Sequence, residues 1–180
     1  YMHDGQNCFQ AFVGDSGFGS WRADEMATRL IRQGRMRECI IVGVSHGGSN
    51  RIPEYLPPYA SYLGTTGRAD QTVSYYRNSV APYINANYRT RTDRDNTALC
   101  GSSMGGLFTT YFAWESTSFA RHHASVSPAY WITSLSGGAI ESTIRLRTGA
   151  PRDVRMWRDR GTIDSLGQDV SGGGDGMQDT

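Results

Sequence analysis

The stretch that most constrains the fold is the five-residue pattern Gly101-Ser102-Ser103-Met104-Gly105. A short apolar run precedes this pattern, and a run with helical character follows it. In that context G-x-S-x-G predicts a sharp turn from a strand into a helix, with Ser103 at its tip. Glycine is expected at both ends because the strand and helix backbones approach too closely for a side chain. The Ser103 hydroxyl should therefore project over the end of a sheet.

This turn suits a nucleophilic serine. The backbone N–H of Met104 begins the helix, so it is free to bind a negative charge that develops on a substrate oxygen. Matches to a five-residue pattern also arise by chance, and the alternative is a glycine-rich turn that only packs. The context on both sides favours the nucleophile.

Strand-like and helix-like segments alternate along the chain. Strands are expected at the start of the chain and at 39–44, 97–101, 123–127 and 154–157, and helices at 21–33, 71–88, 104–115 and 138–147. Alternation predicts an α/β fold whose mostly parallel sheet has helices on both faces. The β-branched run 39–44 predicts a strand covered on both faces, and 45–68 is predicted to be a long ordered loop. Pro82 should kink the second helix or split it.

Ligands of such sheets bind beyond the carboxyl ends of the strands. Five polar residues directly follow predicted strands, and we expect them to converge on one edge of the sheet: Asp4, Ser45, Ser103, Ser127 and Asp164.

Composition excludes several classes of function. A net charge of +1 gives no reason to expect a nucleic-acid partner. All 18 basic residues are Arg, which removes Schiff-base lysines and the P-loop lysine. Three cysteines are too few and too scattered for a zinc site or a disulfide framework. No apolar run approaches the roughly 20 residues of a membrane span, so no membrane partner is expected. The length fits a single domain over residues 1–180.

A serine nucleophile needs a base, usually a histidine held by a carboxylate. Asp164 follows the strand after the elbow helix and is the favoured acid, because Gly161 gives the chain room to turn its side chain inward. Asp159 is the competing acid.

The histidines present a difficulty, because none of them follows Asp164. His3 and His46 come after predicted strands, at the functional edge, and either is a candidate base. His122 and His123 precede or begin a strand and should lie at the opposite end.

Several segments together resemble the putative esterase family. They are Tyr1 to Phe9, Trp21, Ile41 to Val44, Arg51 with Glu54 to Pro57, Gly101 to Leu107, and Gly161 to Asp164. The family includes feruloyl and acetyl-xylan esterases, enterochelin-type esterases, esterase D and, more distantly, the mycolyltransferases. The resemblance spans nearly the whole chain and implies an α/β-hydrolase fold, here incomplete at its N- and C-termini.

The resemblance also implies roles for individual residues. It makes Ser103 the nucleophile and Asp164 the acid of a catalytic triad, with no metal or organic cofactor. It places the second oxyanion N–H at Gln6, and a glycine-containing turn after the first strand is where such a donor is expected. The family's histidine would lie beyond Thr180. We therefore expect residues 1–180 alone to hydrolyse esters poorly or not at all.

Other residues near the predicted edge have two interpretations each. Asp4 either orients its loop or contacts a substrate hydroxyl, or it only stabilises a turn. Arg51 and Glu54 are expected to pair and brace the long loop, the alternative being substrate contact. Trp131 follows the carboxyl end of a strand and is predicted to line a substrate pocket.

The sequence thus predicts a serine carboxylic-ester hydrolase that forms an acyl-enzyme on Ser103. Its substrate would be a small-molecule or polysaccharide-linked ester. The alternatives are an acyltransferase to a sugar alcohol and a non-catalytic carbohydrate-binding domain with the same fold. Neither the ester nor the oligomeric state is indicated. A secretory signal would precede Tyr1, so the sequence leaves the compartment unassigned.

Overall fold

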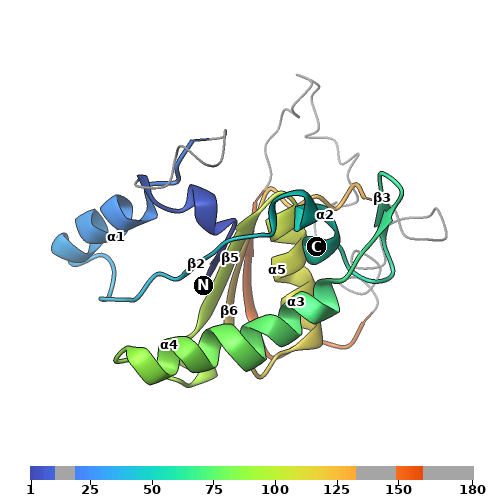
Figure 1. Ribbon diagram of the computed structural model, residues 1–180. Coiled ribbons are helices and arrows are strands. Elements are labelled where there is room, and N and C mark those ends of the chain that lie inside the picture. Colours follow the sequence, from blue (N-terminus) through green and yellow to red (C-terminus); the bar gives the residue numbers. More distant parts are fainter. Residues whose placement is uncertain (11–18, 133–148, 160–180) are drawn as a thin grey trace.

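The computed structural model describes residues 1–10, 19–132 and 149–159 (Figure 1). Within them, five parallel strands form one sheet in the order β2-β1-β5-β6-β7. Its strands are β1 (Met2–His3), β2 (Gly43–Val44), β5 (Ala98–Ser102), β6 (His122–Val126) and β7 (Arg155–Arg158). A separate antiparallel hairpin consists of β3 (Ser61–Tyr62) and β4 (Thr65–Thr66).

The helices are α1 (Ala23–Arg32), α2 (Arg51–Tyr55), α3 (Ala69–Tyr75), α4 (Ala81–Asn87) and α5 (Met104–Glu115). Single 3₁₀ turns occur at Gly5–Asn7, Gly48–Asn50 and Arg94–Asn96. Figure 1 shows α3 and α5 on one side of the sheet and α1 on the other. The predicted α/β alternation and parallel sheet are therefore confirmed. The predicted helix at 138–147 lies outside the described residues.

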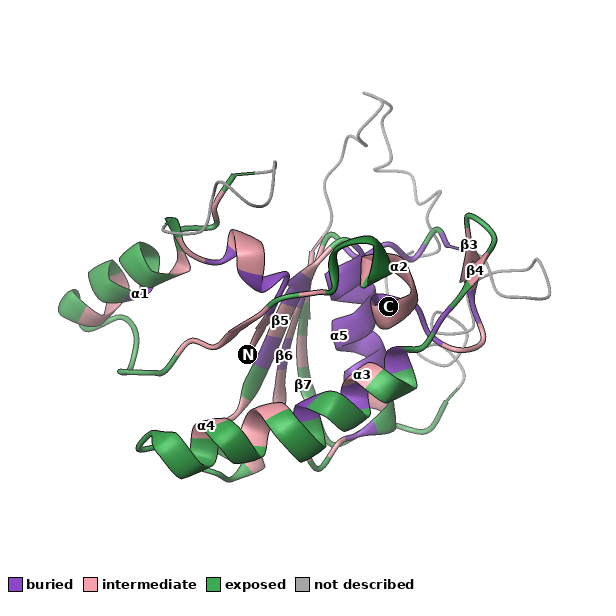
Figure 2. Ribbon diagram, viewed as in Figure 1, coloured by how far each residue is buried: buried purple, intermediate pink, exposed green. Residues whose placement is uncertain are grey.

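Helix α5 is the centre of the core. It is apolar all round, and every residue from Met104 to Ala113 is buried (Figure 2). Leu107, Phe108 and Phe112 are fully buried and pack with aromatic residues of α2 and of the turn after α3. A helix without a polar face must be enclosed, because exposing any side of it would leave apolar surface in water. This enclosure fixes the elbow that precedes α5.

Helix α1 shows the opposite behaviour. Its apolar residues recur at helical spacing, as predicted, but only Ala27 is buried and Met26 is 45% exposed. Figure 2 accordingly shows α1 mostly exposed.

The predicted break at Pro82 is confirmed. A π-helical turn at Tyr76–Val80 separates α3 from α4, and Pro82 lies in the first turn of α4. Proline has no N–H and its ring clashes with the carbonyl four residues earlier. The π-helical turn accommodates the proline, since the backbone stays helical at Val80 and the Ala81 N–H donates to the Tyr76 carbonyl five residues earlier.

Two predictions about the segment 39–68 are wrong. Only Gly43–Val44 forms a strand, and Cys39 is exposed with Ile40 at 47% exposure. The reason is that β2 is the outer strand of the described sheet and packs against β1 and the Gly5–Asn7 turn, so the residues before it lack the helical cover that the prediction assumed. The stretch predicted to be a loop contains α2 and the β3–β4 hairpin.

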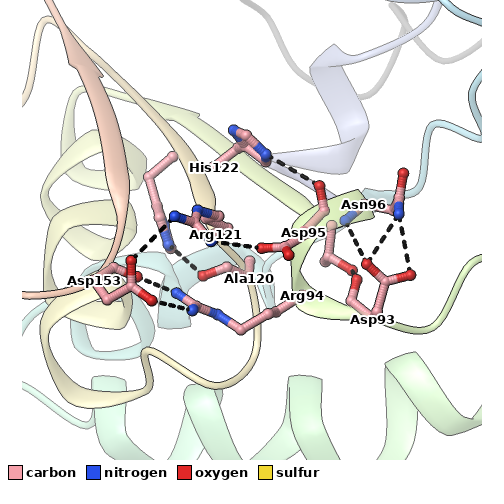
Figure 3. A network of polar contacts seen from close by, with 10 residues as sticks. Asp93, Arg94, Asp95, Asn96, Ala120, Arg121, His122 and Asp153 are labelled. Carbon is pink, nitrogen blue, oxygen red and sulfur yellow. Dashed lines mark hydrogen bonds and ion pairs between the residues drawn. The ribbon is translucent and has the colours of Figure 1, made fainter.

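The amino ends of three strands are tied together by charged side chains (Figure 3). Arg94, just before β5, donates to Asp153 before β7 at 2.7 Å. Arg121, just before β6, contacts Asp153 at 3.3 Å and Asp95 at 3.1 Å. Both aspartates are largely exposed, so each pair contributes little stability alone. Together they hold the strand starts in register at the end remote from Ser103.

Gly101→Ala tests the close approach of β5 and α5. A Cβ at residue 101 would lie 2.4 Å from the Gly105 carbonyl oxygen, and backbone cannot rotate away as a side chain can. We expect the free energy of unfolding, measured with urea, to fall by at least about 1–3 kcal/mol. Ser102→Ala is the control, because it changes the next residue of β5 without adding an atom to the strand. Equal losses for both variants would contradict this packing.

Candidate active site

Ser103 lies at the tip of a strained strand-to-helix elbow. Its backbone has φ 56° and ψ −119°, a region that costs about 1–3 kcal/mol for a residue with a side chain. The surrounding backbone holds it there: the Ser103 N–H donates to the Val126 carbonyl at 3.0 Å. The Ser103 carbonyl accepts from the N–H groups of Leu107 and Ala129, each at 3.0 Å. The residue itself is exposed, while Met104 beside it is buried.

Positions 105 and 106 are glycine because neighbouring atoms leave little space for a Cβ atom. A Cβ at Gly106 would lie 3.0 Å from the Val126 carbonyl oxygen, and one at Gly105 would lie 3.0 Å from Asp4 Oδ2. The predicted reason for glycine, close backbone approach, is observed at Gly101, whereas the atoms nearest Gly105 belong to side chains. The first N–H groups of a helix have no acceptor within it, so the Met104 N–H lies at the electropositive end of α5.

A second turn, residues Asp4 to Asn7, lies beside the elbow because β1 is the neighbour of β5 in the sheet. Asp4 takes the left-handed conformation, with φ 56° and ψ 53°, and the Asn7 N–H closes the turn on the Asp4 carbonyl at 2.8 Å. Gly5 presses against β2, since a Cβ there would meet the Gly43 carbonyl carbon at 2.7 Å. The turn cannot move toward β2 without a clash.

Gln6 is tied to the segment that follows β2. Its side-chain Nε2 donates to the His46 carbonyl at 2.9 Å, and its Oε1 accepts from the His46 N–H at 3.4 Å. The side chain of Gln6 is thus engaged in anchoring the turn. Its backbone N–H comes before the first hydrogen bond that closes the 3₁₀ turn, where donors have no partner within the turn.

Asp4 is almost fully buried, with 8% exposure, and its polar groups are all engaged. Arg51 binds the carboxylate through two bonds, Nε to Oδ1 at 2.6 Å and Nη2 to Oδ2 at 3.0 Å. The Asp4 N–H donates to the Tyr55 hydroxyl at 2.9 Å. His46 Nε2 lies 3.7 Å from Oδ1.

The predicted Arg51–Glu54 pair is wrong. Arg51 binds Asp4, and Glu54 instead accepts the Gly47 N–H at 2.9 Å. Residues three apart are neighbours on a helix, so the spacing allowed the pair, but the buried Asp4 carboxylate binds Arg51 through two bonds instead. The role of Arg51 and Tyr55 at Asp4 was missed. Their spacing of four places them on one face of α2, but it does not say what that face meets.

The surroundings of Tyr55 and Arg51 determine the protonation states of these two side chains. Burial, followed by the nearby Asp4 carboxylate, raises the pKa of Tyr55 well above its usual value, so its hydroxyl stays protonated. Burial alone would lower the pKa of Arg51, but the hydrogen bond and charge of Asp4 outweigh it and raise that pKa. The Tyr55 hydroxyl is therefore neutral and the Arg51 guanidinium carries its positive charge.

The two histidines at the functional edge are engaged elsewhere. His3 is buried, its Nδ1 lies 2.7 Å from the Tyr76 hydroxyl, and desolvation holds its pKa well below the usual value. His46 faces Asp4 as described above. Within the described part of the chain, no hydrogen bond links either histidine to Ser103.

The other two histidines lie at the amino end of β6, as predicted. His122 Nε2 lies 3.1 Å from the Asp95 carbonyl oxygen, and His123 Nε2 lies 3.1 Å from that of Ala120. Burial lowers the pKa of His123 to about 4.

The favoured acid, Asp164, lies outside the described residues. Its competitor Asp159 follows β7 directly, and its Oδ1 accepts the Ser127 N–H at 2.8 Å. Ser127 has φ 39°, so Asp159 stabilises a strained turn at the end of β6.

Trp131 is 54% exposed, and its ring meets that of Tyr62 edge-on at 5.2 Å. A cavity of about 340 Å³ lies between β2, α2 and α3, and its lining includes His46, Tyr55 and Thr72. Ser103 is not one of the described residues that line this cavity.

The described ranges contain no group of three or more side chains that could hold a metal ion. In the same ranges, none of the helices combines the length and the apolar character that crossing a bilayer requires.

Comparison with known proteins identifies the family. The model of the family described as putative esterase matches residues 1–171. The chain belongs to that family. An uncharacterised protein of Bacillus subtilis strain 168, YbbA, is 23% identical to this esterase-family chain over 167 residues, which are 90% of this chain and 60% of the relative.

Solved structures of esterases share the fold. The enterobactin esterase FES of Shigella flexneri matches with a TM-score of 0.64 at 19% identity, over 86% of this chain and 37% of its own. A ferulic acid esterase of Anaeromyces mucronatus matches with a TM-score of 0.59 at 22% identity, over 92% of this chain and 60% of its own. These likenesses confirm the predicted α/β-hydrolase fold. The chain thus spans between 37% and 60% of the length of these relatives.

The buried histidines predict that acid destabilises this protein. The folded pKa values of His123 and His3 lie below the usual 6.5, so the unfolded chain binds more protons as the pH falls from about 6.5 toward 4. Stability should fall over that window by up to about 1.4 kcal/mol per pH unit for each histidine. His123→Gln should flatten the dependence of the unfolding midpoint on pH. His122→Gln is the half-buried control, and equal slopes for the two variants would argue against the assignment.

Proposed function

We propose that the protein is a carboxylic-ester hydrolase that works through an acyl-enzyme on Ser103. The observation that carries the proposal is the exposed Ser103 on a strained elbow, at the N-terminus of α5 and beside the Asp4–Asn7 turn. Membership of the putative esterase family supports ester hydrolysis as the chemistry.

The proposed reaction begins when the Ser103 hydroxyl attacks the ester carbonyl and loses its proton to a histidine. The carbonyl oxygen becomes an oxyanion, and the N–H groups of Met104 and Gln6 donate to it. The tetrahedral intermediate then expels the alcohol, which takes up the proton, and water releases the acid from Ser103 by the same steps. In this proposal Asp164 orients the histidine, which the family resemblance places after Thr180.

The geometry around the N–H groups of Met104 and Gln6 supports their proposed role as oxyanion donors. Both are backbone groups, so neither depends on a side-chain rotamer. The elbow and the Asp4–Asn7 turn are both held in place by close contacts with neighbouring atoms. Removing one donor of this kind typically lowers kcat by about 100- to 1000-fold.

The structural relatives support a proposal for the substrate class. Enterobactin esterase FES and the ferulic acid esterase share the fold, as does the siderophore hydrolase EstA of Aspergillus nidulans. We infer an ester of a small molecule or of a polysaccharide-linked acid. The exposed Trp131, packed against Tyr62, is proposed to line the binding site for the acid part.

Ser103→Ala tests the nucleophile in a protein of full natural length that carries these residues. Hydrolysis of p-nitrophenyl acetate should fall by at least about 1000-fold, because alanine at the tip of the elbow has no hydroxyl to attack the ester. A fluorophosphonate probe should label the unmodified protein at Ser103 and leave the variant unlabelled. Ser102→Ala, one residue earlier on β5, is the control and should retain activity. Equal rates for Ser103→Ala and the unmodified protein would remove the proposal.

Gln6→Pro tests the second oxyanion donor, since proline has no N–H. Gln6→Ala is the matched control: it loses the same side-chain bonds to His46 but keeps the N–H. We expect kcat of the proline variant to lie about 100- to 1000-fold below that of the alanine variant, with similar KM values. Two variants with the same kcat would show that the Gln6 N–H does not act on the oxyanion.

A further inference from the structure

The side chain of Tyr55 joins the turn that carries the Gln6 N–H to α5, the helix that begins directly after Ser103. Its ring stacks flat on Phe108 of α5, with ring centroids 5.3 Å apart and planes 10° apart. Its hydroxyl accepts the buried N–H of Asp4 at 2.9 Å. A rigid aromatic ring thus spans the gap from the first turns of α5 to the start of the Asp4–Asn7 turn.

Arg51 completes the link from the same face of α2. Its guanidinium grips the Asp4 carboxylate through two bonds, and its Cζ lies 5.4 Å from the centre of the Tyr55 ring. The carboxylate also lies against the first turn of α5, since a Cβ at Gly105 would be 3.0 Å from Asp4 Oδ2. A helix N-terminus stabilises a negative charge placed there.

Asp4 needs this support because its N–H is buried and its backbone takes the left-handed conformation. A buried N–H without an acceptor costs about 1–3 kcal/mol, and a non-glycine residue pays a further steric cost in this conformation. The direction of the chain at Asp4 sets where the N–H of Gln6, two residues later, points.

We propose that Tyr55 and Arg51 are positioning residues: through Asp4 they set the direction of the Gln6 N–H relative to Ser103. The inference rests on the proposed function, because it assumes that this N–H binds the oxyanion. Neither side chain touches the substrate in this scheme. They act by fixing a backbone donor, and a misplacement of about 1 Å in such a site costs up to about 100-fold in rate.

Tyr55→Phe is the sharpest test, because it keeps the stack on Phe108 and removes only the acceptor of the Asp4 N–H. In a protein of full natural length we expect kcat for p-nitrophenyl acetate to fall by between tenfold and about 100-fold with KM unchanged. Affinity for a trifluoromethyl ketone, which forms a tetrahedral adduct with an active serine, should fall by the same factor. Arg51→Met should behave similarly. Arg51→Lys should retain part of the kcat that Arg51→Met loses, because lysine keeps a positive charge beside the Asp4 carboxylate.

Tyr76→Phe is the matched control. It removes another buried hydroxyl of the same aromatic cluster, the one that meets His3 Nδ1 at 2.7 Å, without touching the turn. It should lower the unfolding midpoint and leave kcat and ketone affinity within twofold of the unmodified protein. A merely structural role for Tyr55 would give the same pattern as Tyr76→Phe, and that result would overturn the inference. An unmodified protein that neither hydrolyses the ester nor reacts at Ser103 would overturn the proposed function itself.

Discussion

The structure depends on how closely the backbone of β5 approaches that of α5. The Gly101 position and the Gly105 carbonyl leave no room for a single methyl group, and this contact forces the chain through the strained conformation of Ser103. The strain is held because α5 is apolar on every side and enclosed along nearly its whole length. A helix that could shift toward solvent would let the elbow relax. Burial of α5 therefore keeps the Ser103 hydroxyl exposed at the carboxyl edge of the sheet.

The two ends of the sheet use charge in different ways. At the amino ends of the strands, Arg94 and Arg121 share largely exposed aspartates, and such pairs are individually weak and screened by salt (Figure 3). At the carboxyl ends, Asp4 is buried and gripped by Arg51. Removing one partner of a buried pair leaves an uncompensated charge, so the second arrangement is far less tolerant of change. The buried Asp4–Arg51 pair lies beside the elbow, where we propose that backbone geometry matters for catalysis.

Much of this fold can be predicted from the sequence because its signals are local. The G-x-S-x-G pattern, the helix from Met104 to Glu115 and the break at Pro82 each follow from backbone sterics within a few residues. The run 39–44 misled because apolar, β-branched residues are the same whether a strand has neighbours on one side or on two. The pairing of Arg51 with Glu54 misled for a related reason: proximity in sequence was weighed, while Asp4, 47 residues away, is the partner.

The sequence by itself determined the elbow, the order of strands and helices, and the residues that follow each strand, because these depend on local backbone geometry and on the period of apolar residues. Only the tertiary structure decided which of those residues meet. In the folded chain Arg51, Tyr55 and His46 all lie against Asp4. His3 contacts Tyr76, and Asp159 accepts the Ser127 N–H. Such contacts are set by the sheet order and by the rotation of α2 about its axis, and neither leaves a mark in the spacing of residues along the chain.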